Sequence, residues 1–183
     1  TPMVATARLI KQEHPDASVV FIGPCASKKL EASRRTVRSD VDFVITFEEL
    51  TGMFEAKGIL LDEIKAMDEM KDATAAGRGY GVAGGVANAI KECIEKYYPG
   101  TPVNIQHAES LAECNKGLLL AKAGKMNGCL IEGMACPGGC IAGAGTNIAI
   151  PVAAKAVDKF KNEAEKKVPD ESVDQEMVEL EKE

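Results

Sequence analysis

The chain has 183 residues, of which 45% are hydrophobic and 27% charged, and its formal net charge is −6. This composition supports an ordinary buried core and excludes a wholly disordered chain, and no apolar run is long enough to span a membrane. Because only 4% of the residues are aromatic and the charge balance is acidic, we expect no nucleic-acid binding.

Short apolar strands alternate with amphipathic helices along the chain. The pattern predicts helices at 4–14, 47–58, 86–97 and 110–123, with a further short one around 60–71, and strands at 17–23, 41–46, 102–106 and 128–134. Because each strand is a short continuous apolar run, we expect buried strands that pair in parallel. The predicted fold class is therefore α/β, with a parallel sheet of about four strands flanked by helices. Right-handed crossovers would place the carboxyl ends of these strands along one edge, where ligands bind in such sheets.

The negative charge is concentrated at the carboxyl-terminal end of the chain. Residues 158–183 contain ten Asp or Glu and five Lys, which accounts for −5 of the net −6. We expect a folded body at 1–157 and an acidic helix or tail at 158–183. The tail is interpreted as solvated, with a partner-binding segment as the alternative.

The six Cys are too few for a disulfide scaffold, so we expect a cytoplasmic protein whose clustered Cys serve metal or redox chemistry. The strongest motif is MACPGGCIAGAG at 134–145, which contains Cys136 and Cys140. Thiolates beside glycine N–H groups are what an iron–sulfur cluster needs, although the spacing leaves zinc, a redox dithiol and a tight turn open.

Cys25 lies in GPCASKKLEA, directly after the first predicted strand. It is either a third thiolate beside a cation, or part of a plain strand-to-helix turn that Ser27 caps. The remaining cysteines are expected to fill core or boundary positions: Cys93, Cys114 and Cys129.

The glycine-rich stretch RGYGVAGGVANAI at 78–90 is not a dinucleotide fingerprint, because its glycines break the G-x-G-x-x-G order and no strand precedes it. The N–H groups at the start of the following helix could still face an anionic ligand. His14 and His107 are isolated in the sequence, and we expect them to be ordinary polar or surface residues.

Three separated segments together resemble the catalytic domain of iron-only (FeFe) hydrogenases. They are GPCASKKLEA, VDFVITFEEL with the later GVAGGV helix start, and IEGMACPGGCIAGAG, in the family's order over about residues 1–150. The resemblance implies that 1–157 form the C-terminal lobe of the H-cluster domain. It also implies an oxidoreductase that interconverts dihydrogen with protons and electrons. Its cofactor, the H-cluster, joins a 4Fe–4S cube to a two-iron unit that bears carbon monoxide, cyanide and a bridging dithiolate.

Matching the segments residue by residue gives the site that the resemblance implies. Cys25, Cys136 and Cys140 look like three of the four metal ligands, and Cys140 looks like the one that bridges the cube and the two-iron unit. Lys28 resembles the lysine that hydrogen-bonds a cyanide ligand, and its charge would offset an anionic cofactor. Lys28 and Met134 are the implied catalytic positions. The other implied cofactor contacts are Pro2, Pro24, Ala83, Gly84 and Gly85.

The chain also departs from the family pattern. It contains no T-S-C-C-P-like segment, which in the family holds the first ligand and a proton-relay Cys, and it lacks the remaining relay residues. Gly23 stands where the family usually has Met, and GAGTN at 143–147 replaces Gly-Gly-Gly-Gln-Pro. These differences indicate a divergent branch.

We therefore expect a fragment of a hydrogenase that is inactive alone. Its implied partners are the missing N-terminal lobe, a ferredoxin-like electron carrier, and dihydrogen and protons. The alternative is a hydrogenase-like iron–sulfur assembly protein without hydrogenase activity, and a third option is a plain α/β domain with a structural metal such as zinc.

Overall fold

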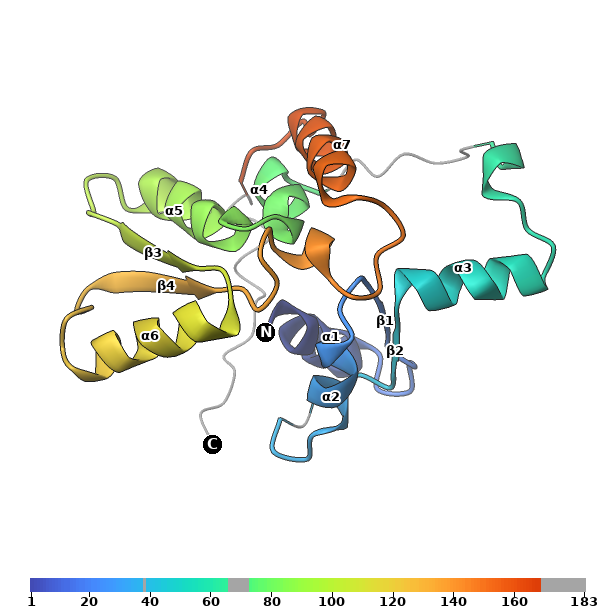
Figure 1. The fold of residues 1–183 in the computed structure, drawn as a ribbon, viewed down its shortest axis with the longest axis horizontal. Helices are drawn as coiled ribbons and strands as arrows, with labels where there is room; N and C mark the ends of the chain where they lie inside the picture. Colours follow the sequence, from blue (N-terminus) through green and yellow to red (C-terminus); the bar gives the residue numbers. More distant parts are fainter. Residues whose placement is uncertain (38, 66–72, 169–183) are drawn as a thin grey trace. The chain divides into compact units, whose positions relative to one another are not determined.

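The structure is a computed structural model that describes residues 1–37, 39–65 and 73–168. These residues divide into two compact units. Unit 1 contains 1–65 and 143–147, and unit 2 contains 73–142 and 148–168. Each unit is built around one pair of parallel strands joined by a helical crossover (Figure 1).

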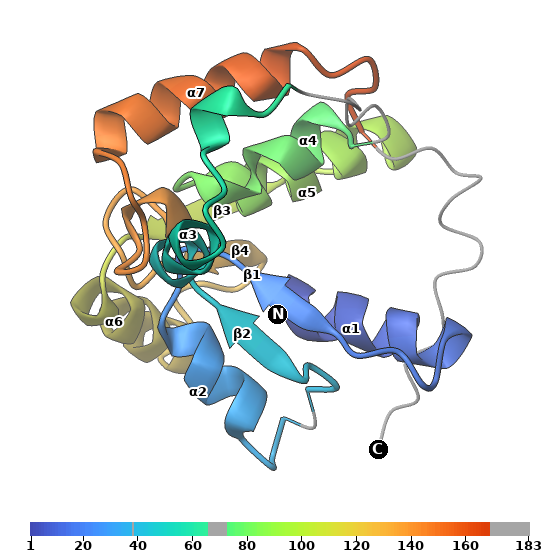
Figure 2. The same cartoon turned by 90° about the vertical axis from the view of Figure 1, so that its right-hand side faces the viewer.

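Unit 1 begins with a helix, continues into a β–α–β unit, and ends its first segment with a further helix and a turn. In chain order the elements are α1 (Pro2–Glu13), β1 (Val20–Ile22), α2 (Ser27–Ser33), β2 (Phe43–Ile45), α3 (Phe47–Ala56) and the 3-10 turn η1 (Leu61–Glu63). Figure 2 shows α2 beside β2, the strand to which it leads. Helix α3 starts at a capping box, in which Thr46 Oγ1 accepts from the Glu49 N–H and the Glu49 carboxylate accepts from the Thr46 N–H.

The two faces of the β1–β2 pair differ in burial. On one face, Phe21 and Val44 pack against a core formed by Met3, Val4, Ala7 and Val41. On the other face, Val20, Ile22 and Phe43 are 44%, 45% and 62% exposed. The continuous apolar runs predicted fully buried strands, and that prediction is wrong here, because the core that includes α1 covers one face only among the described residues.

Unit 2 contains a second β–α–β unit. Its elements are α4 (Ala75–Arg78), η2 (Gly79–Gly81), α5 (Gly85–Tyr97), β3 (Asn104–Ala108), α6 (Leu111–Lys122), β4 (Cys129–Gly133), η3 (Cys140–Ala142) and α7 (Ile150–Asn162). The β3–β4 pair lies between α5 and α6 (Figure 1). Arg78 joins α4 to α7, because its guanidinium lies over the Phe160 ring and its Nη1 donates to the Phe160 carbonyl.

The α/β class with parallel strands and flanking helices is confirmed. The four predicted strands are present, but they form two pairs, β1–β2 and β3–β4, in place of one sheet. The short helix expected around 60–71 is a 3-10 turn at Leu61–Glu63, and 66–71 lie outside the described residues. None of the described helices has the length and apolar character needed to cross a membrane.

The expected division into 1–157 and 158–183 stays a prediction. Residues 158–162 continue helix α7, which ends at Asn162. Most of the expected acidic tail, 169–183, lies outside the described residues.

Candidate metal centre

Cys25 lies just beyond the carboxyl end of β1, in the turn that leads into α2. The Gly23 N–H still donates to the Ile45 carbonyl at 3.1 Å, and Pro24 then ends the ladder because it has no N–H to donate. The Cys25 side chain is half-buried, and its Sγ lies 3.0 Å from Ser27 Oγ. The alternative of a turn that Ser27 caps is wrong about the cap. The N-cap is Ala26, and the Ser27 hydroxyl lies against the thiol.

Lys28 forms a short ion pair within the first turn of α2. Its Nζ lies 2.6 Å from Glu31 Oε2, and Thr1 Oγ1 donates to Glu31 Oε1 at 2.7 Å. Burial raises the pKa of the Glu31 carboxyl, but the hydrogen bonds from Lys28 and Thr1, with the charge of Lys28, outweigh it and hold that pKa below its ordinary value. Lys29 pairs with Glu49 instead. Lys28 is the more buried lysine, with 18% of its side chain exposed against 43% for Lys29.

A second segment of unit 1, Gly143–Asn147, closes over the Cys25 turn, and we call it the 143–147 strap. The Gly145 N–H donates to the Pro24 carbonyl at 2.9 Å, and the Gly145 carbonyl accepts from the Glu48 N–H at 3.2 Å. A Cβ on Gly145 would lie 2.5 Å from Thr46 Cβ, so a side chain does not fit there. The strap therefore joins the residues that follow β1 to those that follow β2.

Cys136 and Cys140 lie in unit 2, on the loop that follows β4. The loop starts where the Met134 N–H donates to the Ala108 carbonyl, and it turns where the Gly139 N–H donates to the Cys136 carbonyl at 2.9 Å. Met134, Cys136 and Cys140 are all half-buried. This placement beyond the carboxyl end of a parallel strand agrees with the expectation from the strand pattern.

The middle of this loop is held on two sides. The Gly138 N–H donates to Glu109 Oε2 at 3.0 Å, and the Gly138 carbonyl accepts from the Ala83 N–H at 3.1 Å. Gly139 has φ +91°, a conformation that L residues rarely adopt. A Cβ on Gly139 would lie only 2.4 Å from the Ala83 nitrogen. Glycine is therefore required where the loop crosses the turn that precedes α5.

The start of α5 is occupied by a carboxylate of the chain itself. The Glu132 side chain, from β4, is buried and accepts hydrogen bonds from the Gly84 N–H at 2.6 Å and the Ala87 N–H at 3.0 Å. Its Oε2 also lies 3.1 Å from His107 Nδ1. The amides that could have faced an anionic ligand thus bind Glu132. His107 is exposed, as expected of a surface residue, and it also contacts this buried carboxylate.

The structure places the other implied residues within these surroundings. Pro2 is the first residue of α1 and is exposed. Gly85 is buried, and a Cβ there would lie 2.0 Å from the Gly79 carbonyl oxygen, so close packing of the turn also requires this glycine. Sequence reasoning missed Glu31, Glu109 and Glu132. The available signal for Glu132 was a charged residue inside an apolar strand, IEGM.

The six cysteines form no disulfide. Cys25 lies in unit 1, whereas Cys136 and Cys140 lie in unit 2. In the described part of the chain, no group of three or more His, Cys, Asp or Glu side chains is placed to hold a metal ion. The donor chemistry fits an iron–sulfur cluster, because half-buried thiols lie on turns just beyond parallel strands. The three expected filler cysteines are half-buried in α5, α6 and β4: Cys93, Cys114 and Cys129.

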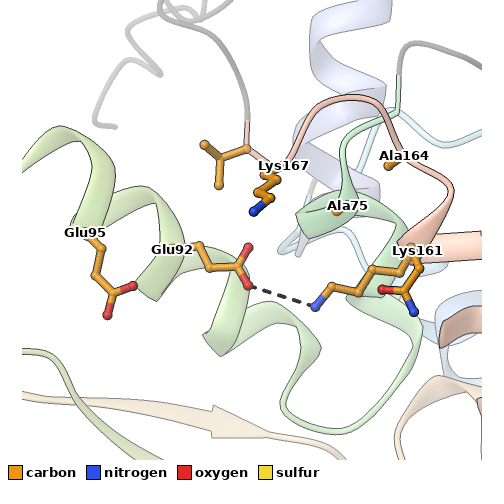
Figure 3. Close-up of a pocket in the computed structure, with 8 residues that line it drawn as sticks. Ala75, Glu92, Glu95, Lys161, Ala164 and Lys167 are labelled. Carbon is orange, nitrogen blue, oxygen red and sulfur yellow. Dashed lines mark ion pairs between the residues drawn. The ribbon is translucent and has the colours of Figure 1, made fainter.

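A separate hollow of about 540 Å³ in unit 2 contains none of the implied site residues (Figure 3). Charges of both signs line it, including an ion pair between Glu92 and Lys161 at 3.9 Å. It has no cysteine among its lining residues, so it is not part of the candidate centre.

The sequence model of the iron-only hydrogenase large subunit, C-terminal domain, matches residues 1–144. This range contains both cysteine loops and Lys28. The chain belongs to this family. The resemblance inferred from the three sequence segments is thereby confirmed. The two cysteine loops are therefore compared with those of iron-only hydrogenases.

Relatives of this iron-only hydrogenase domain include both hydrogenases and an assembly factor. A stretch of 53 residues is 43% identical to the cytosolic Fe-S cluster assembly factor NAR1 of Kluyveromyces lactis, covering 29% of the chain and 11% of that protein. A solved structure of HydA(deltaEFG), described as revealing stepwise FeFe-hydrogenase H-cluster assembly, matches with a TM-score of 0.61 and 21% sequence identity. The match covers 96% of this chain and 62% of the HydA(deltaEFG) chain. A variant of the FeFe-hydrogenase HydA1 from Chlamydomonas reinhardtii matches with a TM-score of 0.61 and 20% sequence identity. The match covers 91% of this chain and 61% of the HydA1 chain.

These structural matches show the fold. The chain spans less than two thirds of the length of either hydrogenase, and only 11% of the assembly factor.

Proposed function

We propose that this chain is part of the catalytic domain of an iron-only hydrogenase, and that Cys25, Cys136 and Cys140 supply thiolate ligands to its H-cluster. The observation that carries the proposal is the family match over 1–144, which includes both cysteine loops in one continuous range. When bound, the H-cluster supplies the metal chemistry that interconverts dihydrogen with protons and electrons.

Lys28 is the proposed cyanide partner and charge-balancing group. An ammonium group has three donors, and the contact with Glu31 uses one of them. The remaining N–H groups are the donors that a cyanide ligand would accept from, while Glu31 restrains the flexible lysine side chain. Low exposure of the Lys28 side chain strengthens such a hydrogen bond, because less water competes for it.

The other implied cofactor contacts would act by packing. The N–H of Ala83 donates to Gly138, and the N–H of Gly84 donates to Glu132. Neither amide is therefore spare, so Ala83, Gly84 and Gly85 would limit space and exclude water. We propose the same for Met134 and Pro24, which are half-buried, and for Pro2.

Three thiolates leave a cubane cluster one protein ligand short. The 183 residues contain no T-S-C-C-P-like segment to supply it. We therefore expect these residues to be inactive by themselves. The proposed partners are an N-terminal lobe that carries the first ligand, and a ferredoxin-like electron carrier.

The test is anaerobic reconstitution of the chain with the complete cofactor, followed by infrared spectroscopy and a dihydrogen-evolution assay. We expect carbon monoxide and cyanide bands and little or no turnover. Lys28→Ala should shift or remove the cyanide bands, whereas the matched variant Lys29→Ala should leave them unchanged, because Lys29 pairs with Glu49. Equal shifts in both variants would count against the role of Lys28. Robust turnover would overturn the expected inactivity.

A second candidate function is that of an iron–sulfur assembly protein that carries only cube clusters. The observation in its favour is the 43% identity to the NAR1 assembly factor over 53 residues. Reconstitution would then give stoichiometric iron and sulfide and the electron paramagnetic resonance signal of a reduced cube, with no carbon monoxide or cyanide bands. Stoichiometric zinc in place of iron would favour a structural metal and contradict both functions.

A further inference from the structure

We propose that Glu132 is a positioning residue for the Cys136–Cys140 loop: its carboxylate fixes the turn on which that loop rests. What the loop holds depends on the function proposed above, whereas the positioning itself is a property of the protein alone. Glu132 is not itself a proposed ligand; it acts through the backbone amides that it binds.

The Glu132 carboxylate is buried and its oxygens are hydrogen-bonded. Only 7% of the Glu132 side chain is exposed, and a buried carboxylate is costly unless its oxygens are satisfied. Here Oε2 accepts from the Gly84 N–H and Oε1 from the Ala87 N–H, with His107 Nδ1 beside Oε2. The positive end of α5 further favours a negative charge at this place.

The turn at Gly84 is linked directly to the Cys136–Cys140 loop. Ala83 directly precedes Gly84, and its N–H donates to the Gly138 carbonyl at 3.1 Å. Gly139 crosses the same turn so closely that a Cβ would lie 2.4 Å from the Ala83 nitrogen and 2.6 Å from the Val82 carbonyl carbon. Any displacement of the turn must therefore move the middle of the loop.

These contacts form a closed ring. Glu132 belongs to β4, the strand from which the loop departs. The ring runs from Glu132 to Gly84, through Ala83 to Gly138, and back along the loop to β4. A ring closed by a carboxylate with two amide donors fixes both the start and the middle of the loop.

Glutamate is the side chain that this geometry requires. Glutamine has one oxygen and one NH₂ group, so it would present a donor to one of the two amides that Glu132 now accepts from. Aspartate keeps the charge but is one methylene shorter. Glu132→Gln keeps the reach but loses the charge and one acceptor, whereas Glu132→Asp keeps the charge and both acceptors but loses reach. The pair therefore separates the effect of reach from that of charge and hydrogen-bond pattern.

The first experiment uses the metal-free chain and does not depend on any cluster. Amide hydrogen exchange and the alkylation rate of each cysteine are compared in the wild type, in both Glu132 variants, and in Glu95→Gln. Glu95 is 59% exposed on α5 and serves as the matched control. In Glu132→Gln we expect exchange at Gly84 and Ala87 to rise roughly tenfold to a hundredfold, as for the loss of a hydrogen bond to a charged group.

The positioning role also predicts changes in the Cys136–Cys140 loop, which a simple helix cap does not predict. Exchange at Ala83 and Gly138, and alkylation of Cys136, should also rise roughly tenfold, while alkylation of Cys25 in unit 1 stays unchanged as the internal reference. Faster exchange confined to Gly84 and Ala87 would overturn the proposal. If Glu132→Gln fails to fold, the milder Glu132→Asp is held to the same pattern, and a wild-type pattern in that variant overturns the requirement for reach.

The second experiment repeats the comparison after anaerobic incubation with iron and sulfide. We expect the Glu132 variants to bind roughly tenfold less iron, or to give a broadened paramagnetic resonance spectrum, with Glu95→Gln like the wild type. A wild-type chain that binds no iron would contradict the proposed function and leave the positioning to be decided by exchange. Wild-type iron binding with unchanged spectra in both Glu132 variants would overturn the positioning role.

Discussion

Cys25 and Cys136 each follow a parallel strand, Cys25 the first strand of the β–α–β unit in unit 1 and Cys136 the second strand of that in unit 2. The Cys25 turn in unit 1 is closed by the 143–147 strap and by ion pairs at the surface of α2. The loop of Cys136 and Cys140 in unit 2 is held by backbone contacts with the turn before α5 and by carboxylates, one of them buried.

This difference separates two ways of fixing a cysteine beyond a parallel strand. Where two backbone segments pack closely, an added side-chain atom finds no space, so substitutions there should have large effects. Ion pairs near the surface tolerate replacement and are weakened by water and salt. We therefore expect unit 2 to respond most strongly to glycine substitutions and unit 1 to respond to pH.

The largest effect is expected from Gly139→Ala in the loop of unit 2. The new Cβ would lie 2.4 Å from the Ala83 nitrogen, at a φ of +91° that alanine rarely adopts. We expect a loss of about 3 to 5 kcal/mol in the free energy of unfolding, measured by chemical denaturation. Gly128→Ala is the matched control, because Gly128 has φ +74° and a Cβ there would meet nothing within 4 Å, and it should lose about 1 kcal/mol. Equal losses would show that backbone conformation, and not the close contact, dominates.

A smaller loss is expected from Gly145→Ala in the strap of unit 1. Its Cβ would lie 2.5 Å from Thr46 Cβ, but Gly145 is not among the glycines with positive φ, so the substitution adds a close contact without the backbone strain expected at Gly139. We expect a loss of about 2 to 3 kcal/mol. Gly52→Ala, in the interior of α3 with nothing within 4 Å, should instead stabilise the chain by up to about 1 kcal/mol. A neutral Gly145→Ala would mean that the strap does not hold the Cys25 turn.

Much of the fold could be predicted, because helix and strand positions follow local rules. The predicted helix at 110–123 appears as α6 (Leu111–Lys122), with Ser110 as its N-cap accepting from the Glu113 N–H. The pairing of the strands into two sheets could not be predicted. Apolar runs indicate where strands form, but they do not specify which strands become neighbours or, as β1 and β2 show, whether both faces are covered.

The sequence predicted the candidate ligands, but it did not predict the residues that hold them in place. Cys25, Cys136 and Cys140 stand in recognisable motifs, and their role as ligands stays a prediction. The contact of His107 with Glu132 depends on the register of β3 and β4, which places these two residues opposite each other. The bond from Gly145 to Pro24 joins segments far apart in the sequence, so no local pattern reveals it.

A pH-dependent effect should distinguish unit 1. Because the pKa of the folded Glu31 carboxyl lies below its ordinary value of 4.5, the Lys28–Glu31 pair adds stability above that pH and loses it as the pH falls through the folded pKa. Glu31→Gln should therefore cost up to about 1 kcal/mol near neutral pH and much less in acid. Denaturation curves at both pH values provide the measurement.

The cause of this pH effect can be tested directly. In Lys28→Met, the pKa of Glu31 should return towards its ordinary value, as followed by an NMR titration of its carboxyl carbon. An unchanged pKa would assign the shift to Thr1 and the chain terminus instead. Part of the acid sensitivity should persist in Glu31→Gln, because the pKa of Asp42 is also lowered, by the Val19 N–H and by Lys11.

The smallest effect is expected from Asn147→Ala at the end of the strap. The exposed Asn147 side chain donates from Nδ2 to the Phe47 carbonyl at 3.2 Å and to Thr51 Oγ1 at 2.7 Å. Hydrogen bonds that compete with water contribute little, so we expect a loss of about 0.5 to 1 kcal/mol. Thr51→Val removes one of the two acceptors, and a double-mutant cycle of denaturation measurements should give a coupling of about 0.5 kcal/mol. A loss in Asn147→Ala as large as that in Gly145→Ala would place the strength of the strap in its side chains. Polar side chains would then contribute as much to the cysteine turn of unit 1 as the close packing of Gly145, in contrast with the backbone-fixed loop of unit 2.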